Sequence, residues 1–266
     1  MENFKYFLGA LLAIPLLPIM IFQGRRVRKN IPDLPEARGW AGIARTGGSA
    51  EMNLLVLGES TMAGVGVKTH EEGFSGSLAQ ALSQSFDADI HWKVYAKSGH
   101  TAEKIKDDTI PLIEEEAFDL IVIGLGGNDA FRLNPPMKWK WNLQGLITKL
   151  RNRFGQTPIV FINMPPIRSF PAFTPLMKFF LGNHVEILGD VLTKLVSDGE
   201  NVYYYSRKIT LEDWIARLEI SATPADFFSD GVHPSRLTYQ TWGRDTAGYI
   251  FNTQKLKRIL QSRIKV

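Results

Sequence analysis

Short apolar runs alternate with longer segments of helical spacing from Asn53 to near the C-terminus. The apolar runs predict buried strands over residues 53–57, 90–95, 119–125, 158–163 and 201–205. The longer segments predict helices over residues 74–86, 101–116, 141–154, 176–197 and from Ser235 onward. This alternation is typical of βαβ units, so we expect a mostly parallel sheet covered on both faces, a three-layer α/β/α sandwich.

A separate apolar run, Tyr6–Phe22, carries no charged residue and is followed by the sequence RRVRK. As a helix it is ~25 Å long, short of a ~30 Å hydrocarbon core, and Pro15 and Pro18 are expected to kink it. We expect membrane association through residues 6–22. A marginal transmembrane helix, a re-entrant or interfacial anchor and an uncleaved signal-like segment stay open, as does a buried or domain-swapped arm.

Charge supports this division of the chain. Residues 1–29 hold five basic residues and one acidic residue, whereas the rest of the chain is balanced, so the net charge of +4 lies in the N-terminal segment. This distribution argues against a nucleic-acid-binding domain. The positive flank favours a cytoplasmic face for the catalytic domain, and its position after the run argues against a cleavable signal peptide.

The chain is therefore divided into three parts. Residues 1–29 are the expected anchor, residues 30–50 contain Pro and Gly without a clear period and are expected to be a linker, and residues 51–266 form the expected catalytic domain. The sequence has no cysteine, which excludes disulfides, thiolate catalysis and Cys-ligated metal. No histidine spacing typical of a metal site is present. The oligomeric state is left open.

Four short polar segments follow predicted strands. They are Gly58-Glu59-Ser60-Thr61, Ser98-Gly99, Gly126-Gly127-Asn128-Asp129 and Ser229-Asp230-Gly231-Val232-His233-Pro234. The carboxyl ends of parallel strands meet at one edge of a sheet, where ligands bind. We therefore expect the four segments to converge.

Their side chains are chemically complementary. The Ser60 hydroxyl needs a base to become a nucleophile, and the imidazole of His233 is suited to that role. Asp230 stands three residues earlier and is placed to orient the imidazole. The oxyanion formed in acyl transfer needs donors, which the backbone N–H groups of Ser60 and Gly99 and the side-chain amide of Asn128 are able to supply.

The order of these motifs, G-[DE]-S, a lone Gly, G-x-N-D and D-x-x-H, resembles the SGNH (GDSL-like) hydrolase family over roughly residues 53–250. The resemblance implies a flavodoxin-like α/β/α fold, the triad and oxyanion-hole roles just described, and no metal or organic cofactor. Glu59 stands where the family usually has Asp, and we expect it to support the loop rather than to react.

Each of these residues also has a structural explanation when taken alone. Ser60 is a possible helix cap, Gly99 a turn glycine, Asn128 part of an Asx turn and His233 a surface histidine. Only their joint occurrence favours a catalytic site. Among the other histidines, His70 is expected to be solvated, His91 and His184 to face solvent or pack, and His100 is a candidate for the pocket wall.

We therefore expect a serine-dependent carboxylic ester hydrolase that acts on small-molecule, short- or medium-chain acyl esters. Carbohydrate deacetylation or acyl transfer at the same site, and a non-catalytic membrane-anchored binding module, are the alternatives. The aromatic stretches 131–141 and 164–180 are candidates for the acyl pocket or a lid, with ordinary packing as the alternative. The basic tail 255–265 is expected either to touch an anionic membrane or to dock as a terminal helix.

Overall fold

The core of the fold is a six-stranded sheet. The computed structural model describes residues 2–197, 199–217, 219 and 221–264. Its strands lie in the order β1-β3-β2-β4-β5-β6, with β1 antiparallel to β3 and all other pairs parallel. The strands are β1 (Ala41–Ala44), β2 (Glu51–Gly58), β3 (Asp89–Ala96), β4 (Leu120–Gly124), β5 (Ile159–Phe161) and β6 (Val202–Tyr204).

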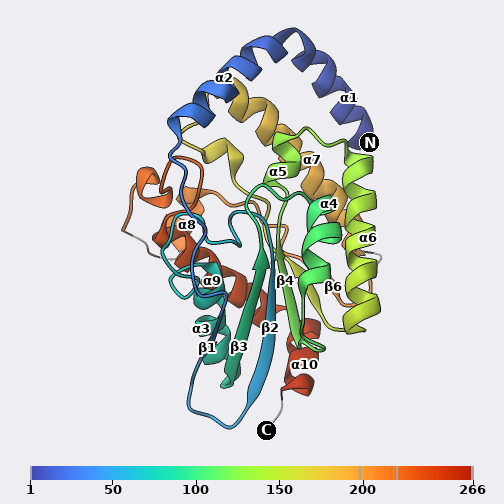
Figure 1. Cartoon of the computed structure of the whole chain (residues 1–266), viewed down its shortest axis with the longest axis vertical. Helices are drawn as coiled ribbons and strands as arrows, with labels where there is room; N and C mark the ends of the chain where they lie inside the picture. The colour runs from blue at the N-terminus through green and yellow to red at the C-terminus, as the bar shows by residue number, and fades with distance from the viewer. Residues whose placement is uncertain (1, 198, 218, 220, 265–266) are drawn as a thin grey trace.

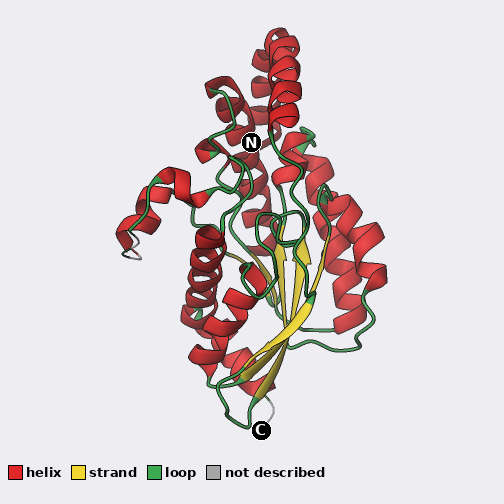
Figure 2. Cartoon of the chain, turned by 60° about the vertical axis from the view of Figure 1, so that its left-hand side comes forward, coloured by secondary structure: helices red, strands yellow, loops and turns green. Residues whose placement is uncertain are grey.

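Helices cover both faces of this sheet (Figures 1 and 2). Because side chains alternate along a strand, Leu55 and Leu57 of β2 join the apolar cluster under α4, α6 and α7, whereas Leu54 and Val56 join the cluster under α3, α9 and α10. These helices are α3 (Phe74–Phe86), α4 (Ala102–Lys104), α6 (Pro136–Phe154), α7 (Pro175–Ser197), α9 (Arg236–Asn252) and α10 (Gln254–Arg263). The predicted three-layer α/β/α sandwich is confirmed.

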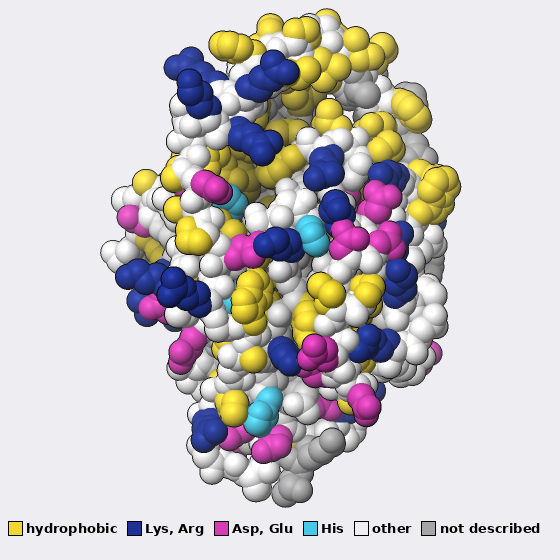
Figure 3. All heavy atoms as spheres, in the orientation of Figure 1, with side chains coloured by type: hydrophobic (Ala, Val, Ile, Leu, Met, Phe, Trp, Pro, Cys, Tyr) yellow, Lys and Arg dark blue, Asp and Glu magenta, His cyan; other side chains and the backbone are white. Residues whose placement is uncertain are grey.

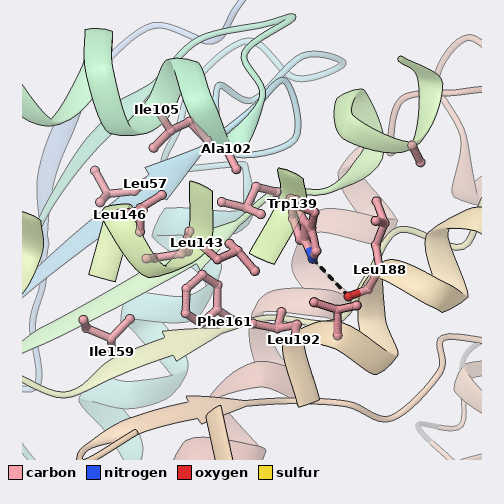
Figure 4. Close-up of a cluster of buried hydrophobic side chains, with 14 of the residues drawn as sticks. Leu57, Ala102, Ile105, Trp139, Leu143, Leu146, Ile159, Phe161, Leu188 and Leu192 are labelled. Carbon is pink, nitrogen blue, oxygen red and sulfur yellow. Dashed lines mark hydrogen bonds between the residues drawn. The ribbon is translucent and has the colours of Figure 1, made fainter. Parts of the chain in front are cut away.

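Trp139 marks the centre of one of these two clusters (Figure 4). Its side chain is fully buried, and its indole Nε1 donates a hydrogen bond to the Leu188 carbonyl at 3.0 Å. This bond satisfies the one polar atom of the ring and joins α6 to α7.

Two predicted segments differ from the structure. The expected linker, residues 30–50, contains strand β1, which pairs Ala41 with Lys93 at the sheet edge. Its small residues hide the strand pattern, and Gly42 is required because a Cβ there would lie 2.3 Å from the Trp92 ring. The expected helix 101–116 is instead α4, a π-helical turn (η2, Ile105–Thr109) and a 3-10 turn (η3, Ile110–Leu112).

The N-terminal segment forms an arch of two helices, which is blue at the top of Figure 1. The arch consists of α1 (Glu2–Ala13), η1 (Ile14–Leu16) and α2 (Leu17–Asn30). Pro15 stands in the first turn of η1 and Pro18 in the first turn of α2, where the N–H that proline lacks would have no helical partner. Among the described residues, no helix is long and apolar enough to cross a membrane.

The arch is fastened to the rest of the chain at both of its helices. The Tyr6 hydroxyl donates to the Leu133 carbonyl at 3.2 Å, and its ring lies 5.4 Å from that of His184. The Thr174 hydroxyl and Gln23 Oε1 are 2.7 Å apart in a hydrogen bond. At the other terminus, Leu256 and Leu260 of α10 are fully buried, which supports the docked terminal helix.

The shorter helical elements lie in the loops that follow the strands. They are α5 (Gly127–Phe131), η4 (Ile167–Ser169), α8 (Leu211–Arg217) and η5 (Pro224–Phe227). None of them was predicted, because helices this short show too little periodicity.

Candidate active site

A cavity of about 820 Å³ lies where the four polar segments meet. Ser60, Ser98, Asn128 and His233 line it, one from each segment. The segments are far apart along the chain, and the parallel sheet brings them to the carboxyl ends of its strands. The predicted convergence of the four segments is therefore observed.

Asp230 lies behind His233. Its Oδ2 is 2.6 Å from His233 Nδ1, and its Oδ1 accepts hydrogen bonds from the backbone N–H groups of Val232 (2.9 Å) and His233 (2.7 Å). The Asp230 side chain is fully buried, and that of His233 is 22% exposed. Burial raises the pKa of Asp230, but the hydrogen bonds from His233 and the backbone outweigh it, so the pKa lies below its usual value. The Asp230 carboxylate is therefore placed at Nδ1 of the His233 ring, the contact by which a carboxylate orients an imidazole.

Ser60 stands in the turn after β2. Its carbonyl accepts a hydrogen bond from Val65 N at 3.1 Å, which shapes the turn. Ser60 and His233 face the same cavity, but within the described part of the chain no hydrogen bond joins their side chains. Contact between nucleophile and base is therefore part of the proposal below.

The loop that follows Ser60 packs directly against the loop that carries His233. Gly66, at φ +107°, permits this approach, because a Cβ there would lie 2.4 Å from the Pro234 carbonyl. The buried Tyr239 hydroxyl of α9 donates to the Val65 carbonyl at 2.7 Å. These two contacts, distant in sequence, hold the loop after Ser60 against the His233 loop and against α9.

The three expected oxyanion donors differ in their surroundings. The backbone N–H groups of Ser60 and Gly99 have no hydrogen-bond acceptor among the residues that the structure describes. The Asn128 amide donates one N–H to the His100 carbonyl at 3.0 Å, and its side chain also interacts with the Glu59 carboxylate. Gly99 adopts φ +80° and follows the cavity-lining Ser98, but it does not itself line the cavity.

Glu59 supports the loop that carries Asn128. Its Oε1 accepts a hydrogen bond from Gly127 N at 2.8 Å, and its Oε2 accepts one from Asn128 N at 2.9 Å. Burial and, to a smaller extent, the nearby Asp129 raise the pKa of Glu59, the hydrogen bonds from Asn128 and Gly127 oppose the shift, and the resulting pKa is about 7. The geometry agrees with the supporting role expected for Glu59.

We expect Glu59→Gln to change the pH dependence of stability. The folded-state pKa of about 7 lies above the ordinary 4.5, so the folded protein retains a proton that the unfolded chain has lost. The free energy of unfolding should therefore fall by about 3 kcal/mol as the pH rises from 4.5 to 7. The glutamine side chain accepts only one of the two backbone N–H groups, so the variant should be less stable than wild type below pH 5. Because glutamine does not titrate, the variant should also lack the fall in the free energy of unfolding between pH 4.5 and 7.

Denaturant unfolding at several pH values measures this effect. Glu103→Gln, which removes an exposed carboxylate paired with Lys138, is the matched control and should keep the wild-type pH dependence. Identical pH dependence in Glu59→Gln and wild type would contradict the assignment.

The other singled-out polar residues have structural roles. Asp129 is fully buried and accepts hydrogen bonds from Ala102 N (2.8 Å) and Asn134 Nδ2 (2.7 Å), so it ties the Asn128 loop to α4. His70 was expected to be solvated, and this prediction was wrong. It is buried with its ring 4.5 Å from that of Trp40, and burial lowers its pKa to about 4.

The remaining histidines lie outside the cavity lining. His184 is buried beneath Tyr6, and burial lowers its pKa to about 4. His100 Nδ1 is 3.0 Å from the Thr109 hydroxyl, and His91 lies 3.6 Å from a Glu51 carboxylate oxygen. No three carboxylate or imidazole side chains of the described residues cluster as a metal site requires.

Apolar side chains make up the rest of the cavity wall. Both aromatic stretches contribute, as expected for an acyl pocket, through Phe131, Leu133, Pro165, Phe170, Phe173 and Met177, and Leu181 extends this wall along α7. The opposite wall comes from α2 of the N-terminal arch, with Leu17, Met20, Ile21, Gly24, Val27 and Arg28, and from Ile31 directly after it. Sequence reasoning missed this wall, although the spacing of three and four residues was a signal for one helix face.

Comparison with known proteins agrees with this architecture. The GDSL-like lipase/acylhydrolase family matches residues 56–241, so the chain belongs to that family. It is 31% identical over 168 residues to esterase TesA from Pseudomonas aeruginosa, a match that covers 57% of this chain and 80% of TesA.

Solved structures show the same fold. A crystal structure of TesA aligns with a TM-score of 0.54 at 22% identity and covers 76% of this chain and 98% of that one. The lipase Lip_vut3 from a goat rumen metagenome aligns with a TM-score of 0.55 at 19% identity and covers 74% and 98%. These structures share the fold, and the family match together with the relationship to esterase TesA identifies the chain as a hydrolase of the GDSL esterase-lipase family.

Proposed function

We propose that this protein hydrolyses carboxylic esters of short or medium acyl chains, with Ser60, His233 and Asp230 as the catalytic triad. The observation that carries this proposal is the buried Asp230 carboxylate bound to His233 Nδ1, with the imidazole facing the same cavity as the Ser60 hydroxyl. An activated serine needs a carboxylate bound to an imidazole and the imidazole bound to the serine hydroxyl. The first of these contacts is present, and substrate binding is expected to complete the second, between His233 and Ser60.

The reaction then proceeds in two halves. The Ser60 oxygen attacks the ester carbonyl carbon while His233 Nε2 takes the hydroxyl proton, and the oxyanion accepts hydrogen bonds from Ser60 N, Gly99 N and the Asn128 amide. The C–O bond to the alcohol breaks, and His233 returns the proton to the leaving oxygen. Water, deprotonated by His233, attacks the acyl-enzyme, and the acid leaves as Ser60 regains its proton.

The cavity favours an acyl ester as the substrate. Its volume of about 820 Å³ lies within the range typical of ligand pockets. Its walls are lined mainly by Leu, Val, Ile, Phe, Met and Pro side chains, which bind an alkyl chain by excluding water from it.

Covalent labelling with a fluorophosphonate probe tests the proposal. We expect stoichiometric modification that maps by mass spectrometry to Ser60 rather than to Ser98, which lines the same cavity. The Ser60→Ala variant should not be labelled. A folded wild-type protein that resists the probe, or labelling that persists in Ser60→Ala, would exclude Ser60 as the nucleophile.

A further inference from the structure

The outer face of the N-terminal arch exposes an unusual density of large apolar side chains. Phe7, Leu11 and Phe22 are 68%, 66% and 68% exposed. Half of the exposed large hydrophobic residues in the described part of the chain fall within this 16-residue stretch: Phe7, Leu11, Leu12, Ile14, Ile19, Ile21 and Phe22, of which Ile21 also lines the cavity. Figure 3 shows hydrophobic side chains gathered along the arch. An exposed apolar patch of this kind marks an interaction site.

A basic cluster borders this patch. Arg25, Arg26, Arg28 and Lys29 are all exposed, and no acidic side chain within the described residues forms an ion pair with them. Figure 3 shows Lys and Arg side chains beside the apolar arch. Cations at the edge of an apolar helix face complement anionic lipid headgroups.

The inner face of the arch belongs to the cavity. Met20 and Val27 of α2 line it from above, and Arg28 lies at the same wall. One helix therefore has its inner side on the ester cavity and its outer side in solvent. A surface bound to the outer side would lie within one helix diameter, roughly 10 Å, of the cavity.

We propose that the arch, residues 2–30, docks the protein flat on an anionic lipid surface and places the cavity at the lipid–water boundary. The apolar patch enters the headgroup region, and Arg25, Arg26 and Lys29 bind anionic headgroups. The arch does not cross the bilayer, because Tyr6 and Gln23 hold it on the catalytic domain. In this position, amphiphilic esters would pass from the lipid into the cavity. This delivery rests on the proposed function, whereas the docking itself does not.

A second copy of the chain is the competing occupant of the patch. A symmetric contact through the arch would bring two copies of the same unpaired basic cluster to one interface, where like charges repel. An anionic surface satisfies both the patch and the cluster, so it is the occupant that the charges favour.

Co-sedimentation of the full-length protein with vesicles tests the docking. We expect binding to vesicles of phosphatidylcholine with phosphatidylglycerol, and weaker binding to phosphatidylcholine alone. Leu11→Gln/Leu12→Gln/Phe22→Gln should lower the affinity for both vesicles at least ~10-fold. Arg25→Gln/Arg26→Gln/Lys29→Gln should lower it ~100-fold for the anionic vesicles and little for the neutral ones.

The matched control is Ile43→Gln/Leu112→Gln, which removes exposed apolar side chains from the catalytic domain and should bind vesicles as wild type does. Circular dichroism establishes that each variant is folded. Ser60→Ala should bind vesicles normally, so a failure of docking is distinguishable from a failure of the proposed hydrolysis. Wild-type protein that does not bind anionic vesicles, or a dimer that the apolar substitutions dissociate, would overturn the proposal.

Discussion

His233→Ala should lower kcat/KM for a soluble ester by at least ~10⁴-fold. The variant lacks the only imidazole that lines the cavity within the described residues, and the Glu59 carboxylate that also lines it already accepts hydrogen bonds from Gly127 N and Asn128 N, so it does not replace the base. Stability should change little by comparison, because His233 is partly exposed and its ring is not part of either apolar cluster. The measurement is steady-state hydrolysis of a p-nitrophenyl ester, with folding monitored by circular dichroism.

The matched control for this loss is His91→Ala. His91 stands near the start of β3, at the end of the sheet opposite the cavity, and touches only a surface glutamate among the described charged groups. Its substitution should leave kcat/KM within about twofold of wild type. If His233→Ala retained more than a tenth of the wild-type activity, the assignment of the base would be wrong.

Asp230→Asn should lower kcat by about 10⁴-fold although the shape of the side chain is preserved. Asp230 Oδ1 already accepts two backbone N–H groups, so the Asn amide nitrogen is forced to the Oδ2 position, facing His233 Nδ1. An amide N–H there donates to Nδ1 and drives the ring proton to Nε2, where the base must be free. The protein should fold but carry the wrong tautomer.

Two measurements separate this tautomer effect from general damage. A downfield imidazole N–H resonance in the proton NMR spectrum, expected for wild type, should disappear in Asp230→Asn. Asp108→Asn, at an exposed aspartate paired with Lys104, should retain both the resonance and the activity. Near-normal kcat in Asp230→Asn would show that the carboxylate does not orient the base.

The strands and the catalytic motifs were the most predictable parts of the chain. The buried strands β2 and β4 are continuous apolar runs, a pattern that side-chain burial on both faces imposes. The Asp230–His233 pair was predictable because three residues in one loop keep both side chains near each other, whatever the rest of the chain does. The oxyanion roles expected for Gly99 and Asn128 came from their chemistry and position after strands, and the resemblance to a known family implies the same roles.

Predictions failed where non-local packing overrides the local pattern. His70 lies in a charged stretch, yet the ring of Trp40 and the surrounding fold bury it. The edge strand β1 has only small residues and Ile43, and it exists because β3 offers it an unpaired edge. The helix expected over 101–116 breaks into short turns, with Pro111 in the first turn of η3.

The sequence by itself determined the order of most of the secondary structure and the local Asp230–His233 pair, because each depends on neighbouring residues. The tertiary structure alone decided that Glu59 binds the Asn128 loop, that Gly66 lets the loop after Ser60 touch the loop that carries His233, and that α2 forms a wall of the cavity. These contacts join segments far apart in the chain. Their geometry follows from how helices and strands pack, which hydrophobic periodicity alone does not specify.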